Sequence, residues 1–391
     1  MRRRYWSAVL LCAAVTVFAG CNDAKEYFER GQEAFEAAEY ETALAEFSKA
    51  LDENPNKAEY YIEQGCTYIA LERYEEAREA LTSAIVEQSL ELTRKNNKRA
   101  WRAIGISYYE EGNYTEAKEY FVKALAERLL PELNADIRMY LADTLECGGD
   151  YDAAIAVYDE LLEEQKDYAA GYRARAYMRY VQGEYEASLA DYEEAIALAP
   201  NNFDLYFGKY NVLEKLGRSA EQKELLRVIT QIESPTPEDA YFIAKAQYFS
   251  GAYDEALVGL AAAATDGYDD AYYYIGEIYH ERSAYGEAVH YFKQYIAGSG
   301  ARDAAAYNQM AICLMKQEKY ADALETVRSG QKLSDPLHGR QLLFNEVVIL
   351  ERTGEYNAAY ERAVEYRNRY PEDTKIKREL EFLASRIRED S

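Results

Sequence analysis

Apolar and small residues recur three and four positions apart along most of this chain. In one recurring pair an aromatic residue precedes a small one by four positions, as in Tyr61 and Gly65. In another an apolar residue precedes a small one by three positions, as in Phe121 and Ala124. Spacings of three and four place such residues on one face of an α-helix. The pattern therefore predicts a long series of amphipathic helices.

A short phrase of the form Gly-x-Tyr-x-x-Ala lies between the two helices of each predicted pair. Its third position is occupied in turn by Tyr40, Tyr74, Tyr114, Tyr151, Tyr185, Ser219, Tyr253, Tyr285, Tyr320 and Tyr356. Successive occurrences lie 34, 40, 37, 34, 34, 34, 32, 35 and 36 residues apart. A period of about 34 residues is typical of helical repeat arrays. The Gly favours the left-handed conformation that ends a helix, and the Asn, Asp or Glu that often follows favours a helix start.

These features resemble the tetratricopeptide repeat, a helix–turn–helix unit of about 34 residues. The resemblance extends over residues 24–373. It implies an all-α fold, a right-handed superhelical solenoid of about ten units with a C-terminal capping helix. The small residues would let the two helices of a unit approach closely, and the Tyr would pack in the turn. Because one unit cannot bury its own apolar face, stacked units would share one continuous core.

The register of the phrase divides the chain. We expect a lipoprotein signal peptide at 1–20, a lipidated N-terminus with a short tether at 21–23, repeats one to six at 24–236, repeats seven to ten at 237–373, and a capping helix and tail at 374–391. The segment SLELTRKNNK adds six residues between repeats two and three, which predicts an extended helix end plus a loop. Repeat six lacks the Tyr and the Ala, and two prolines follow it. The segment 233–239 is therefore either a hinge between two lobes or an irregular loop.

The N-terminal sequence MRRRYWSAVLLCAAVTVFAGC has the parts of a bacterial secretory signal. Three arginines at positions 2–4 precede an apolar run at 7–18, which is shorter than the roughly 20 residues of a membrane span. Two small residues then precede Cys21. This end resembles the lipoprotein box, although Phe18 stands where Leu is expected. The resemblance implies cleavage before Cys21, a diacylglycerol on its sulfur, and an extracytoplasmic, lipid-anchored place in the bacterial cell envelope. An ordinary cleaved signal or an N-terminal anchor helix is the alternative.

The net charge of the chain excludes some classes of partner. The 391 residues carry a net charge of −25, and removal of the three signal arginines would make it −28 (−25 − 3). Acidic charge spread along the chain disfavours a nucleic-acid partner, because such a partner needs a basic face. It also disfavours adsorption on anionic lipid.

After Cys21, the cysteines are Cys66, Cys147 and Cys313. Their number is odd and their spacing wide, so we expect small buried core positions and no disulfide framework.

Few residues in this sequence match known catalytic or metal-binding motifs. His280 and Glu281 resemble half of a zinc-protease motif, but Ala284 occupies the position of its second histidine. His290 and His338 complete the histidines, and we interpret all three as solvent-facing or groove residues. The sequence contains no G-x-S-x-G, no P-loop and no G-x-G-x-x-G pattern. We therefore predict no catalytic residues, no metal site and no cofactor.

The inner face of such a solenoid, formed by the first helix of each unit, is where ligands usually lie in this family. The family's groove positions include aromatic residues such as Phe344 and polar ones such as Asn308. Arg and aromatic side chains dominate binding hot spots, and cations stand out in so acidic a chain. We select as partner-binding candidates Arg102, Tyr109, Arg173, Tyr177, Tyr180, Asn211, Tyr241, Lys245 and Tyr248. The alternative for each inward tyrosine is packing between adjacent first helices.

The sequence thus predicts a membrane-anchored, non-catalytic scaffold or adaptor that binds a protein or peptide in its groove. The Lys and Asn clamp that chaperone-tail binders use is not found in register, so we do not expect recognition of a C-terminal carboxylate. The alternative function is a surface glycan-binding lipoprotein, because aromatic platforms suit sugars. Such lipoproteins usually carry long insertions, whereas no insertion between the repeats of this chain is longer than six residues.

Overall fold

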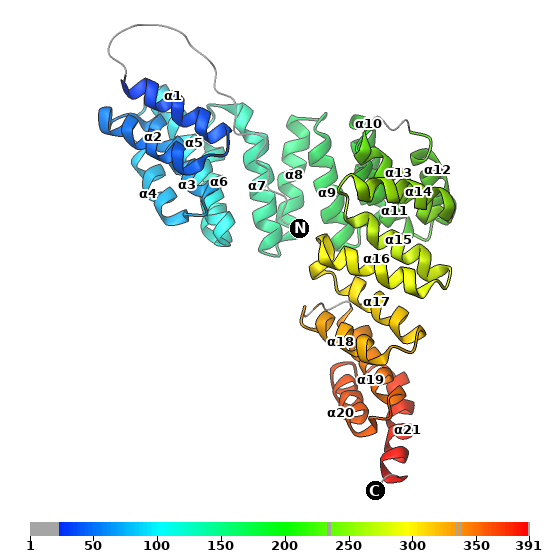
Figure 1. The fold of residues 1–391 in the computed structure, drawn as a ribbon. Coiled ribbons are helices and arrows are strands. Elements are labelled where there is room, and N and C mark those ends of the chain that lie inside the picture. The colour runs from blue at the N-terminus through cyan, green and yellow to red at the C-terminus, as the bar shows by residue number, and fades with distance from the viewer. Residues whose placement is uncertain (1–22, 233–235, 334, 336–337, 390–391) are drawn as a thin grey trace. The chain divides into compact units, whose positions relative to one another are not determined.

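The computed structural model describes residues 23–232, 236–333, 335 and 338–389 (Figure 1). Within these ranges all regular secondary structure is helical and no strand is present. The all-α fold class is therefore confirmed. The predicted signal peptide, Cys21 and residues 233–235 of the predicted hinge lie outside the described residues.

Two compact units make up the chain, Met1–Gly217 and Arg218–Ser391. The division falls inside repeat six, between its first and second helices. The repeat register predicts a lobe boundary later, between residues 236 and 237, and the hinge at 233–239 stays a prediction.

The first unit contains paired antiparallel helices, because each short turn folds a helix back on its predecessor. Its elements are α1 (Asp23–Glu36), α2 (Tyr40–Glu53), α3 (Ala58–Ala70), α4 (Tyr74–Ser83), α5 (Glu91–Glu111), α6 (Tyr114–Ala126), the 3₁₀ helix η2 (Pro131–Leu133), α7 (Asn134–Cys147), α8 (Tyr151–Glu164), α9 (Ala169–Gln182), α10 (Tyr185–Leu198) and α11 (Phe203–Lys215). The predicted insertion between repeats two and three lengthens α5 at its N-terminal end, as expected.

The second unit continues the same arrangement. Its elements are α12 (Ser219–Ile229), α13 (Pro237–Ser250), α14 (Tyr253–Thr265), α15 (Asp270–Glu281), α16 (Tyr285–Ala297), the 3₁₀ helix η3 (Ser299–Arg302), α17 (Ala304–Lys316), α18 (Tyr320–Gln331), α19 (Gly339–Arg352), α20 (Tyr356–Arg369) and α21 (Lys375–Glu389). The last helix packs its buried Ile376, Leu380 and Leu383 into the same apolar cluster as α19 and α20. The predicted capping helix is thereby confirmed.

Each recurring phrase forms the turn inside a repeat, and its third residue is the first residue of the second helix. Helix α5 ends at Glu111, and its C-cap residue Gly112 has a φ of 91°, in the left-handed region. Where the phrase has no Gly, another residue takes this conformation, as Glu72 does with φ 61°. Asp150 caps α8 by accepting a hydrogen bond from the backbone of Ala153 at 3.3 Å, whereas Asn113 makes no side-chain cap on α6. Helix starts are therefore set mainly by the turn conformation.

Small residues at the predicted positions let the two helices of a repeat approach closely. A Cβ atom on Gly105 would lie 2.7 Å from the ring of Phe121, which is fully buried. The equivalent Cβ on Gly276 would lie 2.8 Å from Phe292. Both distances are shorter than van der Waals contact, so a larger residue would force the helices apart. This part of the repeat interpretation is confirmed.

The three described cysteines are free. Cys313 is buried and Cys66 is half-buried, and burial raises the pKa of each thiol to about 12. Cys147 is exposed at the end of α7. The expectation of a buried core position is therefore wrong for Cys147, because it is the last residue of α7 and lies past the buried Thr144 and Leu145.

Candidate binding surface

Two of the predicted binding residues, Arg102 and Tyr109 on α5, face the neighbouring first helix α7. The Arg102 guanidinium pairs with Asp136, and its central carbon lies 5.9 Å from the centroid of the Tyr140 ring. Only 11% of the Arg102 side chain is exposed. The Tyr109 ring packs against Tyr114 and Tyr140, with centroids 6.0 and 5.8 Å apart. Burial raises the pKa of the Tyr109 hydroxyl. Both residues therefore join adjacent helices.

The more open part of the predicted surface in the first unit lies on α9 and on its neighbour α11. Tyr177 is 48% exposed, and Asn211 is exposed as well. Arg173 and Tyr180 are half-buried, and the Tyr180 ring centroid lies 5.7 Å from that of Tyr185. These side chains leave apolar and polar area available to a partner.

The remaining predicted residues lie on α13 in the second unit. Tyr241 is only 6% exposed, and its ring stacks on Tyr268 with centroids 5.6 Å apart. It therefore packs between elements, which is the alternative that the sequence left open for inward tyrosines. Tyr248 is half-buried with its ring centroid 5.2 Å from that of Tyr274, and Lys245 Nζ lies 5.4 Å from the same ring. The predicted lining thus has one part in each compact unit.

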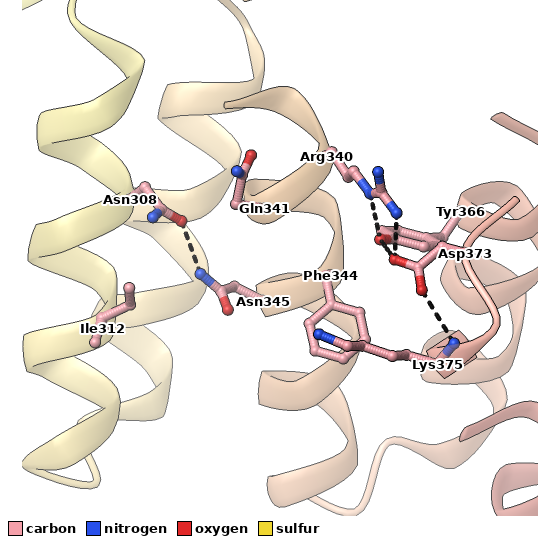
Figure 2. Close-up of a pocket in the computed structure, with 9 residues that line it drawn as sticks. All are labelled: Asn308, Ile312, Arg340, Gln341, Phe344, Asn345, Tyr366, Asp373 and Lys375. Atoms are coloured by element: carbon pink, nitrogen blue, oxygen red, sulfur yellow. Dashed lines mark hydrogen bonds and ion pairs between the residues drawn. The ribbon is translucent and has the colours of Figure 1, made fainter. Parts of the chain in front are cut away.

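A pocket of about 360 Å³ lies in the C-terminal repeats of the second unit (Figure 2). It is lined by Asn308, Ile312, Arg340, Gln341, Phe344, Asn345, Tyr366, Asp373 and Lys375. These residues come from α17, α19, α20, the turn after α20 and the first residue of α21. A volume of this size falls in the range of ligand-binding clefts. The groove positions of the sequence analysis include Phe344 and Asn308, but none of the selected candidates lies here.

Two asparagines cross from one first helix to the next on one side of this pocket. Asn345 on α19 donates a hydrogen bond of 2.8 Å from Nδ2 to Oδ1 of Asn308 on α17. Asn308 is 9% exposed, so this bond satisfies a largely buried amide. A primary amide has two N–H donors and two acceptor lone pairs, and this bond uses one on each side. The pair can therefore also bind the backbone of an extended peptide.

Three polar side chains form the opposite wall (Figure 2). Arg340 Nη2 lies 2.5 Å from Asp373 Oδ2, and Arg340 Nε donates to the Tyr366 hydroxyl at 3.0 Å. The Tyr366 hydroxyl donates to Asp373 Oδ2 at 2.6 Å. Hydrogen bonds from Tyr366 and Arg340 hold the pKa of Asp373 well below its usual value. This wall is therefore an ion pair that the Tyr366 hydroxyl bridges.

The floor and rim of the pocket differ in character. Phe344 is half-buried, with its ring centroid 5.7 Å from that of Tyr366, and Ile312 adds apolar surface from α17. Gln341 and Lys375 are exposed at the rim. An apolar floor beside an amide pair and a rim cation suits an extended peptide with an apolar or acidic side chain.

One sequence signal could have indicated this pocket. Asn308 and Asn345 are separated in the sequence by close to one repeat period. When an asparagine recurs one repeat later on the next first helix, two amides lie on neighbouring inner faces. The Arg340 and Asp373 pair gave no such signal, because Asp373 lies in a turn outside the helical register.

The histidines do not form a metal centre within the part of the chain that the structure describes, where no cluster of three metal-ligating side chains occurs. His280 Nδ1 lies 3.8 Å from Glu281, and the His290 ring packs edge-on against Tyr291 with centroids 5.1 Å apart. His338 Nδ1 lies 3.3 Å from Asp335. As for membrane spans, none of the helices in the described ranges has the length and apolar character to cross a bilayer.

Antiparallel helix pairs that repeat with a period of about 34 residues define a helical-repeat protein of the interaction-scaffold type. One family model for the tetratricopeptide repeat matches residues 28–91 and 102–170, and a second TPR-repeat model matches residues 176–217. The chain is a tetratricopeptide-repeat protein.

Known relatives share the repeats over part of their length. The chain is 22% identical over 226 residues to the TPR repeat-containing protein YpiA of Bacillus subtilis, covering 49% of this chain and 53% of the relative. It is 32% identical over 105 residues to the human Protein SGT1 homolog, covering 27% of each. The chain thus spans about half or less of these relatives. A solved structure, the APC/C hetero-tetramer Cut9–Hcn1, is 12% identical with a TM-score of 0.47, covering 92% of this chain and 96% of that one.

Proposed function

We propose that this protein is a membrane-anchored scaffold lipoprotein that binds a protein or peptide partner on the inner faces of its repeats and performs no catalysis. Tetratricopeptide repeats form rigid surfaces that bind extended peptides without chemical change to the ligand. The observation that carries the proposal is the pocket between α17, α19 and the start of α21. There an amide pair and an apolar floor on neighbouring first helices meet a rim cation at the start of α21.

The anchor part of the proposal rests on the sequence. Cys21 follows a basic start, a short apolar run and two small residues, the arrangement that resembles a bacterial lipoprotein signal. A diacylglycerol on Cys21 would hold the repeats at the extracytoplasmic face of a membrane of the cell envelope. Since α1 begins at Asp23, only Asn22 would separate the lipidated residue from the first helix.

Site-specific photocrosslinking in the native cell tests the binding part. A photoreactive residue replaces Gln341 at the pocket rim or Tyr177 on α9, both of which are exposed. Matched control probes replace Glu325 on α18 and Glu186 on α10, exposed positions on second helices. We expect one protein to be captured from an inner-face position and from neither control, and mass spectrometry then identifies it.

Capture of the same proteins from all four positions, or from none, would contradict a binding surface on the inner faces. The anchor is tested separately with Cys21→Ser. This variant should lose labelling by a radioactive fatty acid and move from the membrane fraction to the soluble fraction. Unchanged labelling would show that Cys21 is not the lipid attachment site.

A further inference from the structure

Helix α5, with 21 residues, begins well before the repeat register requires it. The register places the start of repeat three at Lys98, whereas α5 begins at Glu91. Seven additional helical residues extend the helix by about 10 Å at a rise of about 1.5 Å per residue. The loop at residues 84–90 leads into this extension. We name residues 86–95 the α5 tip.

Hydrogen bonds hold the loop and the base of the tip in place. Asn97 donates from Nδ2 to the Val86 carbonyl at 2.9 Å and accepts from the Val86 N–H at 3.1 Å. Lys98, which is fully buried, donates from Nζ to the Glu127 carbonyl at 3.0 Å. Arg94 binds both carboxylate oxygens of Glu127 at 2.7 and 2.8 Å. The tip is therefore a positioned projection of the repeat.

The positioned tip exposes large apolar side chains. Leu90 is 64% exposed, Leu92 is 67% exposed and Val86 is 39% exposed. Single exposed apolar residues are ordinary on a protein surface, but three close together on one projection indicate a contact with something apolar. None of the three belongs to the apolar cluster that α3, α4 and α5 share.

The tip projects from the same edge of the first unit as the chain's N-terminal end. Each turn reverses the chain, so α1, α3 and α5 run in the same direction, and α3 packs beside both α1 and α5. Their N-terminal ends therefore share one edge. Helix α1 begins there at Asp23, two residues after Cys21, a distance that extended chain spans in about 7 Å.

The tip also differs in charge from the rest of the chain. Residues 86–95 contain two basic residues, Arg94 and Lys95, and two acidic ones, Glu87 and Glu91, for a net charge of 0 (2 − 2). The whole chain carries −25. Bacterial membranes that contain anionic lipid would repel most of this protein but not this segment.

We infer that the α5 tip is a second membrane contact, inserting Leu90 and Leu92 into the bilayer to which Cys21 is attached. The inference rests on the lipid anchor proposed above. Because the acyl chains already supply affinity, the tip orients the repeats: two points of contact on one edge restrict how the first unit can rotate against the bilayer.

Depth-dependent fluorescence quenching tests this contact. The full lipoprotein is produced in a bacterial host and reconstituted in vesicles of phosphatidylethanolamine and phosphatidylglycerol whose acyl chains carry bromine near the headgroup. Tryptophan probes are Leu92→Trp and, as control, Val122→Trp on α6, where the native residue is 50% exposed. Both are made with Trp101→Phe, since Trp101 and Trp6 are the native tryptophans and Trp6 lies in the predicted signal peptide. We expect brominated lipid to lower emission from the probe at 92 about twofold and to leave the probe at 122 unchanged.

The negative outcomes of this experiment distinguish the membrane contact of the α5 tip from the lipid anchor on Cys21. If the vesicles float with the protein and neither probe is quenched, or both are quenched equally, the tip contact is overturned while the anchor stands. A photocrosslink from position 92 to a protein, without quenching, would assign the tip to a protein partner and also overturn the inference. If mass spectrometry finds no diacylglycerol on Cys21 and the protein does not float, the anchor fails, and the tip contact fails with it.

Discussion

The hydroxyl of Tyr366 donates a 2.6 Å hydrogen bond to Oδ2 of Asp373, while the other oxygen of this carboxylate accepts from the backbone N–H of Lys375 at 3.0 Å. Tyr366 belongs to the last repeat, and Lys375 is the first residue of the capping helix α21. One carboxylate therefore joins the two elements. Arg340 binds the same carboxylate from α19 at 2.5 Å, so the junction also forms a wall of the pocket.

We expect Asp373→Ala to loosen α21 selectively. The substitution removes the acceptor for the Lys375 N–H and leaves Tyr366 and Arg340 without their shared partner. The substitution should accelerate hydrogen–deuterium exchange in α21 more than in α17. The control is Glu372→Ala, whose carboxylate is 65% exposed and lies 3.4 Å from Arg340. Equal protection of α21 in both variants would contradict a joining role for Asp373.

The same carboxylate gives the cap a pH dependence. Its pKa is lowered in the folded protein by hydrogen bonds from Tyr366 and Arg340. A carboxyl group with a lowered folded pKa stabilises above its unfolded pKa of 3.8, and this contribution is lost as the pH falls below that value. Protection of α21 in wild type should therefore decrease below about pH 4, whereas Asp373→Ala should show a smaller change over the same range.

The small residues of the repeats give a prediction with a matched control. Gly105→Ala places a methyl group 2.7 Å from the Phe121 ring, which must shift in a buried core. We expect the free energy of unfolding to fall by about 1–3 kcal/mol. Gly286→Ala is the control, because a Cβ there meets no atom within 4 Å. It should be neutral or stabilise by up to about 1 kcal/mol, since alanine favours helix more than glycine. Chemical denaturation measures both.

A buried acid on α15 predicts a second pH effect. Burial raises the pKa of Glu277 to about 7, although Gln309 donates to its carboxylate at 2.9 Å. A carboxyl group whose folded pKa is raised favours folding most below its unfolded pKa of 4.5, and this advantage is lost as the pH rises from there to about 7. Glu277→Gln should therefore raise the free energy of unfolding by about 1–3 kcal/mol at pH 8 relative to wild type, with little difference at pH 4.

The control for this substitution is Glu281→Gln on the same helix, where the side chain is 56% exposed. It should show no comparable dependence on pH. Equal unfolding midpoints for wild type and Glu277→Gln across pH 4–8 would contradict a buried, neutral Glu277.

The periodic features of the fold could be predicted because they depend on local spacing. The sequence separation between Gly105 and Phe121 is repeated between Gly276 and Phe292, and the structure brings both pairs close together. Turn conformations follow the phrase for the same reason. The pairing of polar side chains on neighbouring first helices does not follow from spacing alone. Arg102 was predicted to bind a partner, yet it pairs with Asp136 one repeat later, because the sequence does not show which inner-face side chains satisfy one another.

The candidate pocket was missed for a related reason. Its polar wall depends on Asp373, which lies in a turn, and on the position of α21, which is set by apolar packing of Ile376 and Leu383. A search of groove positions in the helical register cannot find a residue outside that register. The Asn308 and Asn345 pair, one repeat apart, was the accessible part of the site.

This asparagine pair carries the last prediction, for partner binding. Asn345→Ala removes the amide that spans from α19 to Asn308 and leaves the apolar floor in place. Loss of one hydrogen-bonding side chain at a peptide-binding position costs about 1–1.5 kcal/mol, so capture of the partner by a photoreactive residue at 341 should fall about 5- to 13-fold. The control is Asn357→Ala, an exposed asparagine on α20 that does not line this pocket.

Stability must be measured beside binding, since Asn308 is largely buried and loses its partner. Asn345→Ala should lower the free energy of unfolding by no more than about 1.5 kcal/mol, which leaves the repeats folded at the temperature of the assay. A drop in capture with folding preserved, and unchanged capture for Asn357→Ala, would place the partner against the amide pair. Full capture by Asn345→Ala would remove this pocket as the binding site and direct the search to Tyr177 on α9, an exposed member of the residues selected from the sequence in the first unit.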